Sequence, residues 1–87
     1  MKSSSTKYTI KKKIVVEEDV TYKKFVGWRI EQIRKNQSLT QEELSDKLGL
    51  SRVSIVNIEK GRQDLSLRNL QNICELFNIK SSDILPF

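Results

Sequence analysis

The sequence predicts an all-α fold, a compact unit of five helices preceded by an extended N-terminal arm. Three observations point to it. Apolar residues recur at helical spacing from Tyr22 onward, the links between these stretches are short, and three stretches begin with a hydroxyl residue that can cap a helix. With 87 residues the chain has the length of one domain, which we divide into an arm, residues 1–20, and a helical domain, residues 21–87.

The arm differs in composition from the rest of the chain. It is rich in serine, lysine and β-branched residues, with a block of lysines at 11–13 and a block of acids at 17–19. The stretch from Tyr8 to Val16 favours a β-strand, because tyrosine, threonine, isoleucine and valine prefer extended backbone. The same composition is equally consistent with a flexible arm, so the sequence leaves both alternatives open.

The periodic stretches predict helices near residues 22–36, 41–48, 52–60 and 67–77, with a short turn of helix from Ser82. Thr40, Ser51 and Ser66 precede the second, third and fourth of them. Each hydroxyl can accept a hydrogen bond from an unpaired N–H of the first turn, and Glu43 completes a capping box with Thr40. A leucine before each cap is followed by an apolar residue at the spacing of a hydrophobic staple, which fixes each helix start.

Stepping 100° per residue assigns a buried face to each helix. Cys74 lies on such a face and is expected to be a small packed hydrophobe rather than a reactive thiol. The predicted core consists of Tyr22, Val26, Ile30, Ile33, Leu44, Ser45, Leu48, Ser54, Ile55, Ile58, Leu67, Leu70, Ile73, Cys74, Phe77, Ile79, Ile84 and Leu85.

Two aromatic residues do not fit this core. Phe25 and Trp28 fall on the side of the first helix away from Ile30. Single exposed apolar residues are normal, whereas an aromatic pair is a candidate contact surface. We expect either the arm, Ile10 to Val16, or a partner subunit to cover them.

The link LGLS between the second and third helices has the chemistry of a sharp turn. Gly49 can adopt a positive φ at no steric cost, Leu50 can point inward, and Ser51 can begin the next helix. Two helices joined in this way form a helix-turn-helix, and the second presents an open face. That face carries Arg52, Val53, Val56, Asn57 and Lys60.

These outward residues are unusual for a solvated helix, because β-branched valine is a poor helix former at the surface. They suit the DNA major groove, where arginine contacts guanine, asparagine contacts adenine and a small apolar group contacts the thymine methyl. A protein contact through the same valines is the alternative.

Composition excludes several other function classes. The chain has no histidine, which excludes Ser-His and Cys-His nucleophile pairs and histidine metal sites, so we expect no enzyme, no metal and no cofactor. Its single cysteine cannot form an internal disulfide, and no apolar run approaches the length of a membrane span. We therefore expect a soluble cytoplasmic protein whose net charge of +5 permits a polyanion partner.

From about Val26 to Leu85 the sequence resembles the Cro/phage-repressor-type (Xre family) helix-turn-helix domain, a lambda-repressor-like DNA-binding fold. The resemblance covers about 60 of the 87 residues. Ser45 departs from the family pattern, which usually has alanine there, but it is small enough to leave the helix crossing intact. The residues that carry the match are Leu39-Thr40-Gln41-x-x-Leu44, Gly49, Ser51, Ile55 and Ile58-Glu59-x-Gly61.

The resemblance implies which residues meet double-stranded DNA. Arg52, Val53 and Asn57 would face base edges. Ser51 and Ser54 would cap the recognition helix and touch the DNA backbone. Gln41 would bind a phosphate and brace that helix. Lys60, Arg62 and the loop toward Asp64 would approach the neighbouring phosphates. The candidate set is Gln41, Ser51, Arg52, Val53, Ser54, Val56, Asn57, Lys60 and Arg62.

The resemblance also implies a structural ion pair between Arg34 and Glu59, which ties the first helix to the recognition helix. Members of the family usually act as two-fold dimers on inverted-repeat operators, with half-sites roughly 34–36 Å apart. We expect a homodimer formed through the region of Leu76, Ile79 and Phe87 or through the arm.

The leading hypothesis is a sequence-specific transcriptional regulator, a repressor or a small controller protein. The alternatives are an antitoxin that also regulates its own promoter, with the arm as its protein-binding part, and an interaction adaptor without DNA. The arm has three interpretations: it is disordered, it forms a strand that pairs or packs on Phe25 and Trp28, or its lysines 11–13 contact DNA.

Overall fold

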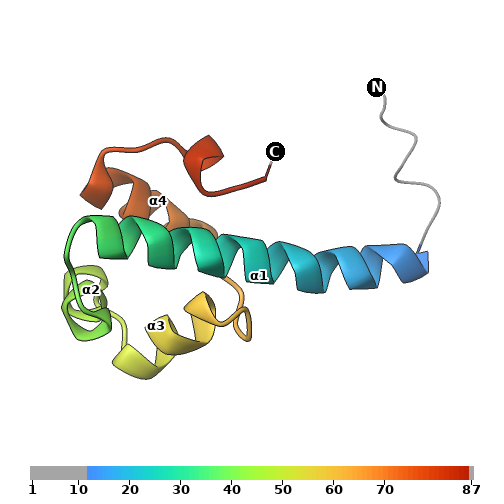
Figure 1. The fold of residues 1–87 in the computed structure, drawn as a ribbon, viewed down its shortest axis with the longest axis horizontal. Coiled ribbons are helices and arrows are strands. Elements are labelled where there is room, and N and C mark those ends of the chain that lie inside the picture. Colours follow the sequence, from blue (N-terminus) through green and yellow to red (C-terminus); the bar gives the residue numbers. More distant parts are fainter. Residues whose placement is uncertain (1–11, 87) are drawn as a thin grey trace.

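The computed structural model describes the backbone of residues 12–86 and the side chains of residues 22–86. One long helix spans the molecule, with two short helices on one side of it and the fourth helix and the C-terminal segment on the other (Figure 1). The elements are α1 (Lys12–Asn36), α2 (Gln41–Leu48), α3 (Arg52–Glu59), α4 (Leu67–Phe77) and a 3-10 turn, η2 (Ser81–Asp83).

The helix α1 begins well before the predicted start at Tyr22. Because Lys12 to Val16 are helical, the prediction of extended backbone does not hold for this part of the arm, and residues 1–11 lie outside the described residues. Extending a helix that has already formed costs little, and lysine and glutamate in this stretch are good helix formers. Those two effects outweigh the strand preference of the β-branched residues.

The remaining boundaries follow the predictions closely. The helices α2 and α4 have the predicted ranges, and α3 ends at Glu59, one residue early. The predicted fifth helix is the single 3-10 turn η2, so residues 12–86 hold four α-helices rather than five. No helix in this part of the chain combines the length and apolar content that a membrane crossing requires.

The predicted helix starts are confirmed by their hydrogen bonds. Thr40 Oγ1 accepts from the Glu43 N–H at 3.0 Å, and Glu43 Oε1 accepts from the Thr40 N–H at 2.8 Å, which is a complete capping box. Ser51 and Ser66 accept in the same way from residues three positions later, each at 3.0 Å. Gly49 adopts φ 69°, as the turn after α2 was expected to require.

A small apolar core lies where the four helices meet. Ser45 is buried as predicted, and Ser54 is half-buried. The predicted residues that are partly buried and pack against the core are Tyr22, Leu48, Leu70, Cys74, Phe77, Ile79 and Leu85. Leu67 is 83% exposed, so its assignment to the core is wrong. It is the first residue of α4, and its side chain is left largely open to solvent. The buried apolar side chains are Val26, Ile30, Ile33, Leu44, Ile55, Ile58, Ile73 and Ile84.

The helices α1 and α3 come close together at Gly27. A Cβ on Gly27 would lie 2.2 Å from the carbonyl oxygen of Ile58 and 2.7 Å from that of Glu59. The two backbones therefore touch where a side chain would normally separate them. This contact sets how far α3 stands from the rest of the domain.

Candidate nucleic-acid interface

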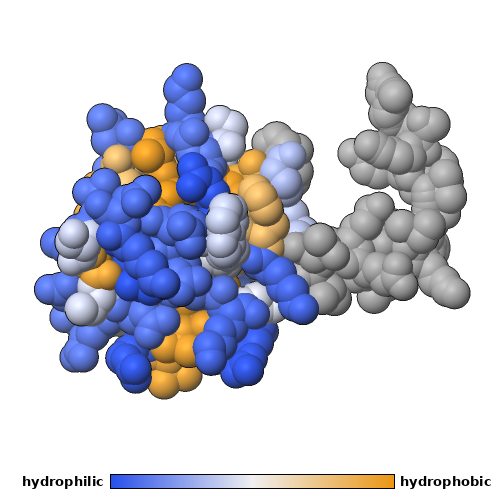
Figure 2. All heavy atoms as spheres, viewed as in Figure 1, coloured by the Kyte–Doolittle hydropathy of each residue, from blue (hydrophilic) through white to orange (hydrophobic). Residues whose placement is uncertain are grey.

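The helix α3 divides into a buried and an outward half. Ile55, Ile58 and Glu59 are buried against the domain, while Arg52 and Val53 are exposed, Val53 at 64%. Figure 2 shows apolar residues emerging over α3 among hydrophilic ones. The structure thus brings the candidate base-contacting residues to one surface, with Val56 and Asn57 half-buried at its inner edge.

The turn from α2 to α3 aims this surface. Leu50 packs against the core and its N–H bonds the Ser45 carbonyl at 2.9 Å, which closes the α2 end. Ser51 caps α3, and its hydroxyl lies 3.2 Å from the Ser54 hydroxyl. The N-terminal turn of α3 is consequently fixed by both serines, as the sequence predicted for the start of the helix.

The electrostatics of α3 favour a polyanion. Its one acid, Glu59, is buried and paired with Arg34, so the outward surface of the helix carries no negative charge. Arg52 at the first position and Lys60 and Arg62 just beyond the last are all exposed cations. Basic side chains at both ends with a small apolar patch between them match a groove flanked by phosphates.

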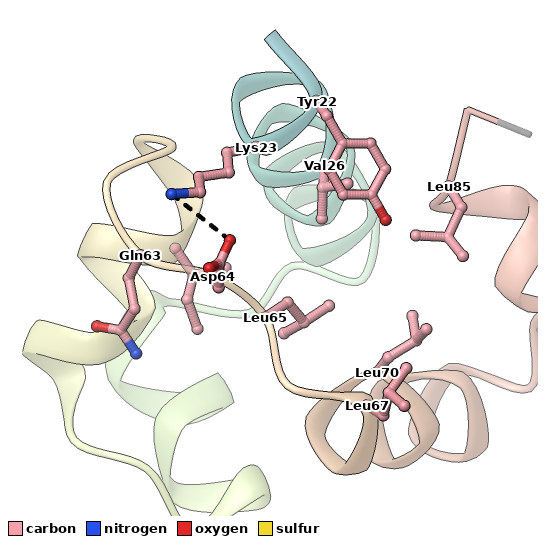
Figure 3. A pocket seen from close by; sticks show the side chains of 10 residues that line it. Tyr22, Lys23, Val26, Gln63, Asp64, Leu65, Leu67, Leu70 and Leu85 are labelled. Atoms are coloured by element: carbon pink, nitrogen blue, oxygen red, sulfur yellow. Dashed lines mark ion pairs between the residues drawn. The ribbon is translucent and has the colours of Figure 1, made fainter. Parts of the chain in front are cut away.

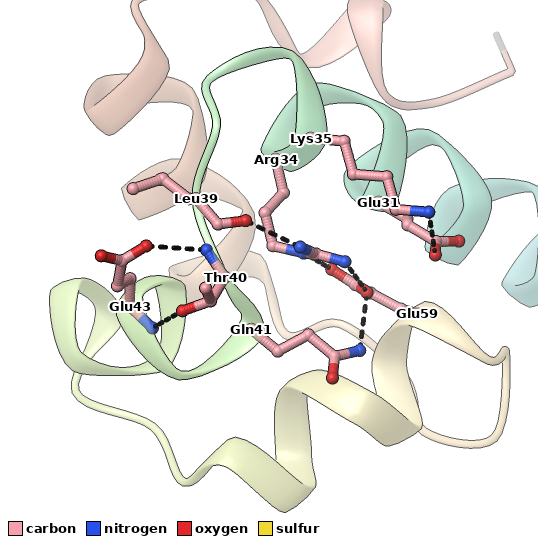
Figure 4. A network of polar contacts seen from close by, with 8 residues as sticks. All are labelled: Glu31, Arg34, Lys35, Leu39, Thr40, Gln41, Glu43 and Glu59. Carbon is pink, nitrogen blue, oxygen red and sulfur yellow. Dashed lines mark hydrogen bonds and ion pairs between the residues drawn. The ribbon is translucent and has the colours of Figure 1, made fainter.

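A buried ion pair holds α3 against α1. Arg34 Nε donates to Glu59 Oε2 at 2.7 Å and Nη2 donates to Oε1 at 3.0 Å, which is a bidentate pair (Figure 4). Arg34 Nη1 also donates to the Leu39 carbonyl at 2.8 Å. The hydrogen bonds that Arg34 donates to Glu59 raise the pKa of its guanidinium against the opposing effect of burial. The ion pair that the resemblance implied is therefore present.

Gln41 joins the same network. Its Nε2 donates to Glu59 Oε1 at 3.0 Å, so the first residue of α2 braces the last residue of α3 (Figure 4). A primary amide has two N–H donors, and this bond uses one of them. The half-buried side chain therefore keeps a second donor at the N-terminus of α2, where backbone N–H groups also favour an anion.

The loop after α3 is tied to α1. Lys60 caps the helix C-terminus, and the Arg62 N–H bonds the Asn57 carbonyl at 2.8 Å, which folds the loop back under the helix. Asp64 forms an ion pair with Lys23 at 3.6 Å. This pair joins the loop after α3 to α1.

The domain also has a cleft of about 230 Å³ between α1, this loop and α4 (Figure 3). Aliphatic side chains and Tyr22 line most of it, with the Lys23–Asp64 pair on one side. None of the nine candidate DNA-contacting residues lines it. The candidate interface is thus the convex surface of α3, not a pocket, and residues 22–86 contain no cluster of side chains that could hold a metal ion.

The role of Gly27 in positioning α3 was not predicted from the sequence. A glycine inside a helix costs about 1 kcal/mol relative to alanine, so its presence in α1 was a signal that a backbone passes close by. Nothing in the sequence indicated that the approaching backbone belongs to α3.

Comparisons with known proteins agree with this geometry. The HTH_3 helix-turn-helix family matches residues 30–84. An uncharacterized HTH-type transcriptional regulator of Methanocaldococcus jannaschii is 43% identical over 56 residues, 64% of this chain and 85% of that protein. The immunity repressor protein of Bacillus phage phi105 is 41% identical over 59 residues, 68% of this chain and 41% of the repressor.

A solved structure shares the fold. The restriction-modification controller protein C.AhdI from Aeromonas hydrophila aligns with a TM-score of 0.66 and 26% identity, over 71% of this chain and 94% of that one. These relatives carry the names of regulators. On its family match, its identity to these regulators and its fold, the chain belongs to the HTH_3 helix-turn-helix family.

Proposed function

We propose that this protein is a sequence-specific DNA-binding transcription regulator that presents α3 to the major groove. The observation that carries the proposal is the outward surface of α3, where Arg52 and Val53 are exposed and the only acid is buried in an ion pair. The family membership and the regulator names of its relatives support it.

Each part of the surface has a role in this proposal. Arg52 and Asn57 hydrogen-bond base edges, and Val53 and Val56 contact thymine methyl groups, which gives sequence selectivity. Ser51 and Ser54 fix the start of the helix and contact the sugar-phosphate backbone. Gln41, Lys60 and Arg62 contact phosphates on either side, which fixes the register of the protein on the duplex.

The protein acts in this proposal as a cytoplasmic homodimer on an inverted repeat. Two copies of α3 then enter successive major grooves, roughly 34–36 Å apart. In this proposal the chain comprises an arm, residues 1–20, and a DNA-binding domain, residues 21–87. The arm, which α1 overlaps from Lys12, is the part available to a protein partner.

Selection of duplexes from a random-sequence library, followed by titration of the enriched and a scrambled duplex, tests the function. The wild-type chain should enrich an inverted repeat and bind it far more tightly than the scrambled duplex. Replacing Arg52, Val53 and Asn57 by alanine should remove that preference while thermal stability stays nearly unchanged, since these side chains lie outside the core.

Lys47→Ala is a matched control, because Lys47 is an exposed cation on α2 rather than α3. It should leave the selected sequence unchanged. If the triple variant still preferred the enriched duplex, the assignment of α3 as the recognition surface would be refuted. If the wild-type chain enriched no sequence, the chain would act as an adaptor instead.

A further inference from the structure

Lys24 on α1 lies against the loop that follows α3, and the proposed DNA contacts do not use it. A Cβ on Gly61 would lie 2.8 Å from Lys24 Cγ, 2.9 Å from its Cα and 3.1 Å from its backbone nitrogen. The loop can approach α1 this closely because Gly61 has no side chain. Gly61 separates Lys60 from Arg62, so the stem of Lys24 lies beside the residue that links two of the proposed phosphate contacts.

The helical period places Lys24 on the side of α1 that faces α3. Positions 24, 27, 31 and 34 are spaced by three and four residues, so they share one side of the helix. On this side Gly27 meets the end of α3, and Arg34 pairs with Glu59. Lys24 lies about one turn before Gly27. It therefore extends this side of α1 just past the C-terminal end of α3.

Lys24 is exposed, and it forms no ion pair with any residue of 22–86. Of the two acids on α3 and the loop after it, Glu59 is buried in its pair with Arg34. The other acid, Asp64, forms its ion pair with Lys23 at 3.6 Å. The charge of Lys24 is therefore available to an anion outside the protein.

Like charges gather around Gly61. Lys60 and Arg62 are exposed, and within the part of the chain whose side chains the structure describes neither forms an ion pair. Neighbouring cations repel one another, so an anion that lies close to all three is favoured. The phosphates of a DNA strand supply such a row of negative charges, about one for each 3.4 Å of helix axis.

We propose that Lys24 is a further phosphate-contacting residue, through which α1 helps to hold the DNA strand that passes the C-terminal end of α3. The proposal rests on the proposed function, because it requires a duplex that lies along α3. Lysine carries its ammonium group on a flexible four-carbon stem, so the part of Lys24 beyond Cγ can follow the strand. A contact of this kind adds affinity and fixes register without reading bases.

Salt titrations of DNA binding by the full chain measure this contact. Lys24→Gln removes the charge and keeps a stem that can lie on Gly61. The slope of the logarithm of the binding constant against the logarithm of the salt concentration should become shallower by about 0.9 for each copy bound, the value for one phosphate of duplex DNA. The change should be equal for the selected and the scrambled duplex. Lys24→Arg keeps the charge and should retain the wild-type slope.

Lys80→Gln is the matched control. Lys80 is also an exposed lysine, but it lies in the C-terminal segment, on the other side of α1 from α3 (Figure 1). Its replacement changes the net charge by the same amount and should leave the slope unchanged.

Thermal unfolding separates the DNA contact from a structural role. A lysine at this place could instead only complement the partial negative charge at the C-terminal end of α3. In that case Lys24→Gln would lower the melting temperature and leave the salt slope as it is. We expect the reverse, a nearly unchanged melting temperature and a shallower slope, because the side chain is exposed.

Three results would overturn the inference: a wild-type slope in Lys24→Gln, an equal loss of slope in Lys80→Gln, or a shallower slope in Lys24→Arg as well. Sequence preference is measured separately, by comparing the selected and the scrambled duplex. A chain that prefers no sequence, but whose slope becomes shallower in Lys24→Gln, refutes the proposed function alone. Selective binding with a wild-type slope in Lys24→Gln refutes this inference alone.

Discussion

Replacing Gly27 by alanine isolates the contact that positions α3. The added Cβ would lie 2.2 Å from the Ile58 carbonyl oxygen, and real contacts of this kind essentially never fall below 3.0 Å. The α3 backbone must therefore retreat from α1 by at least 0.8 Å, the difference between those two distances. Overpacking of this kind costs about 1–3 kcal/mol, and backbone neighbours that cannot rotate away place it near the upper end.

Alanine also gains about 1 kcal/mol over glycine in a helix interior, which offsets part of that cost. The net loss of unfolding free energy is then about 2 kcal/mol, which lowers the melting temperature by roughly 8–16 °C in a domain of this size. Circular dichroism during thermal unfolding measures the melting temperature. The displacement of α3 should also weaken selective DNA binding.

Gly49→Ala is the matched control. Gly49 has open space around its Cα but adopts φ 69°, so alanine there loses roughly 1 kcal/mol from backbone conformation alone. Asparagine at the same position should cost less, because it tolerates the left-handed region. A melting temperature that rises in the Gly27→Ala protein would refute the argument, since helix propensity alone predicts that rise.

Three further predictions follow from the site. Arg34→Met should cost about 3–5 kcal/mol in chemical unfolding by leaving Glu59 buried and unpaired, and adding Glu59→Leu should recover most of it; no recovery would contradict a desolvation origin. Gln41→Ala should weaken binding equally for selected and scrambled duplexes with an unchanged salt dependence, because the lost phosphate contact is uncharged. Burial, and then the charges of Asp83 and Glu75, raise the pKa of the Cys74 thiol. Its alkylation rate should therefore increase with pH only above the range of a free cysteine, and denaturant should abolish that difference.

Much of the domain could be predicted from local signals. Thr40, Ser51 and Ser66 stand where the caps form, and a capping hydroxyl acts on N–H groups within three residues, so its effect is visible in the sequence. The outward position of Arg52 and Val53 followed from the period of the helix. The burial of Glu59 could be anticipated only through the resemblance to a family.

Other features depended on how the helices pack. Leu67 has the spacing of a core residue, yet it is 83% exposed, because it lies at the first position of α4 and lines the open cleft instead of entering the core. The early start of α1 at Lys12 opposed the local strand preference, since helix growth depends on the helix already formed after it. Local propensity depends only on neighbouring residues, so the sequence pattern predicted neither the exposure of Leu67 nor the start of α1 at Lys12.

The sequence by itself determined the start of each short helix, the turn at Gly49 and the composition of the recognition surface, because these depend on contacts within a few residues. The tertiary structure decided how α3 is presented. The Gly27 contact and the network of Arg34, Gln41 and Glu59 join residues 18 to 32 positions apart, and only packing brings them together. It also left Phe25 and Trp28 partly exposed, because they lie on the side of α1 away from the buried Val26 and Ile30.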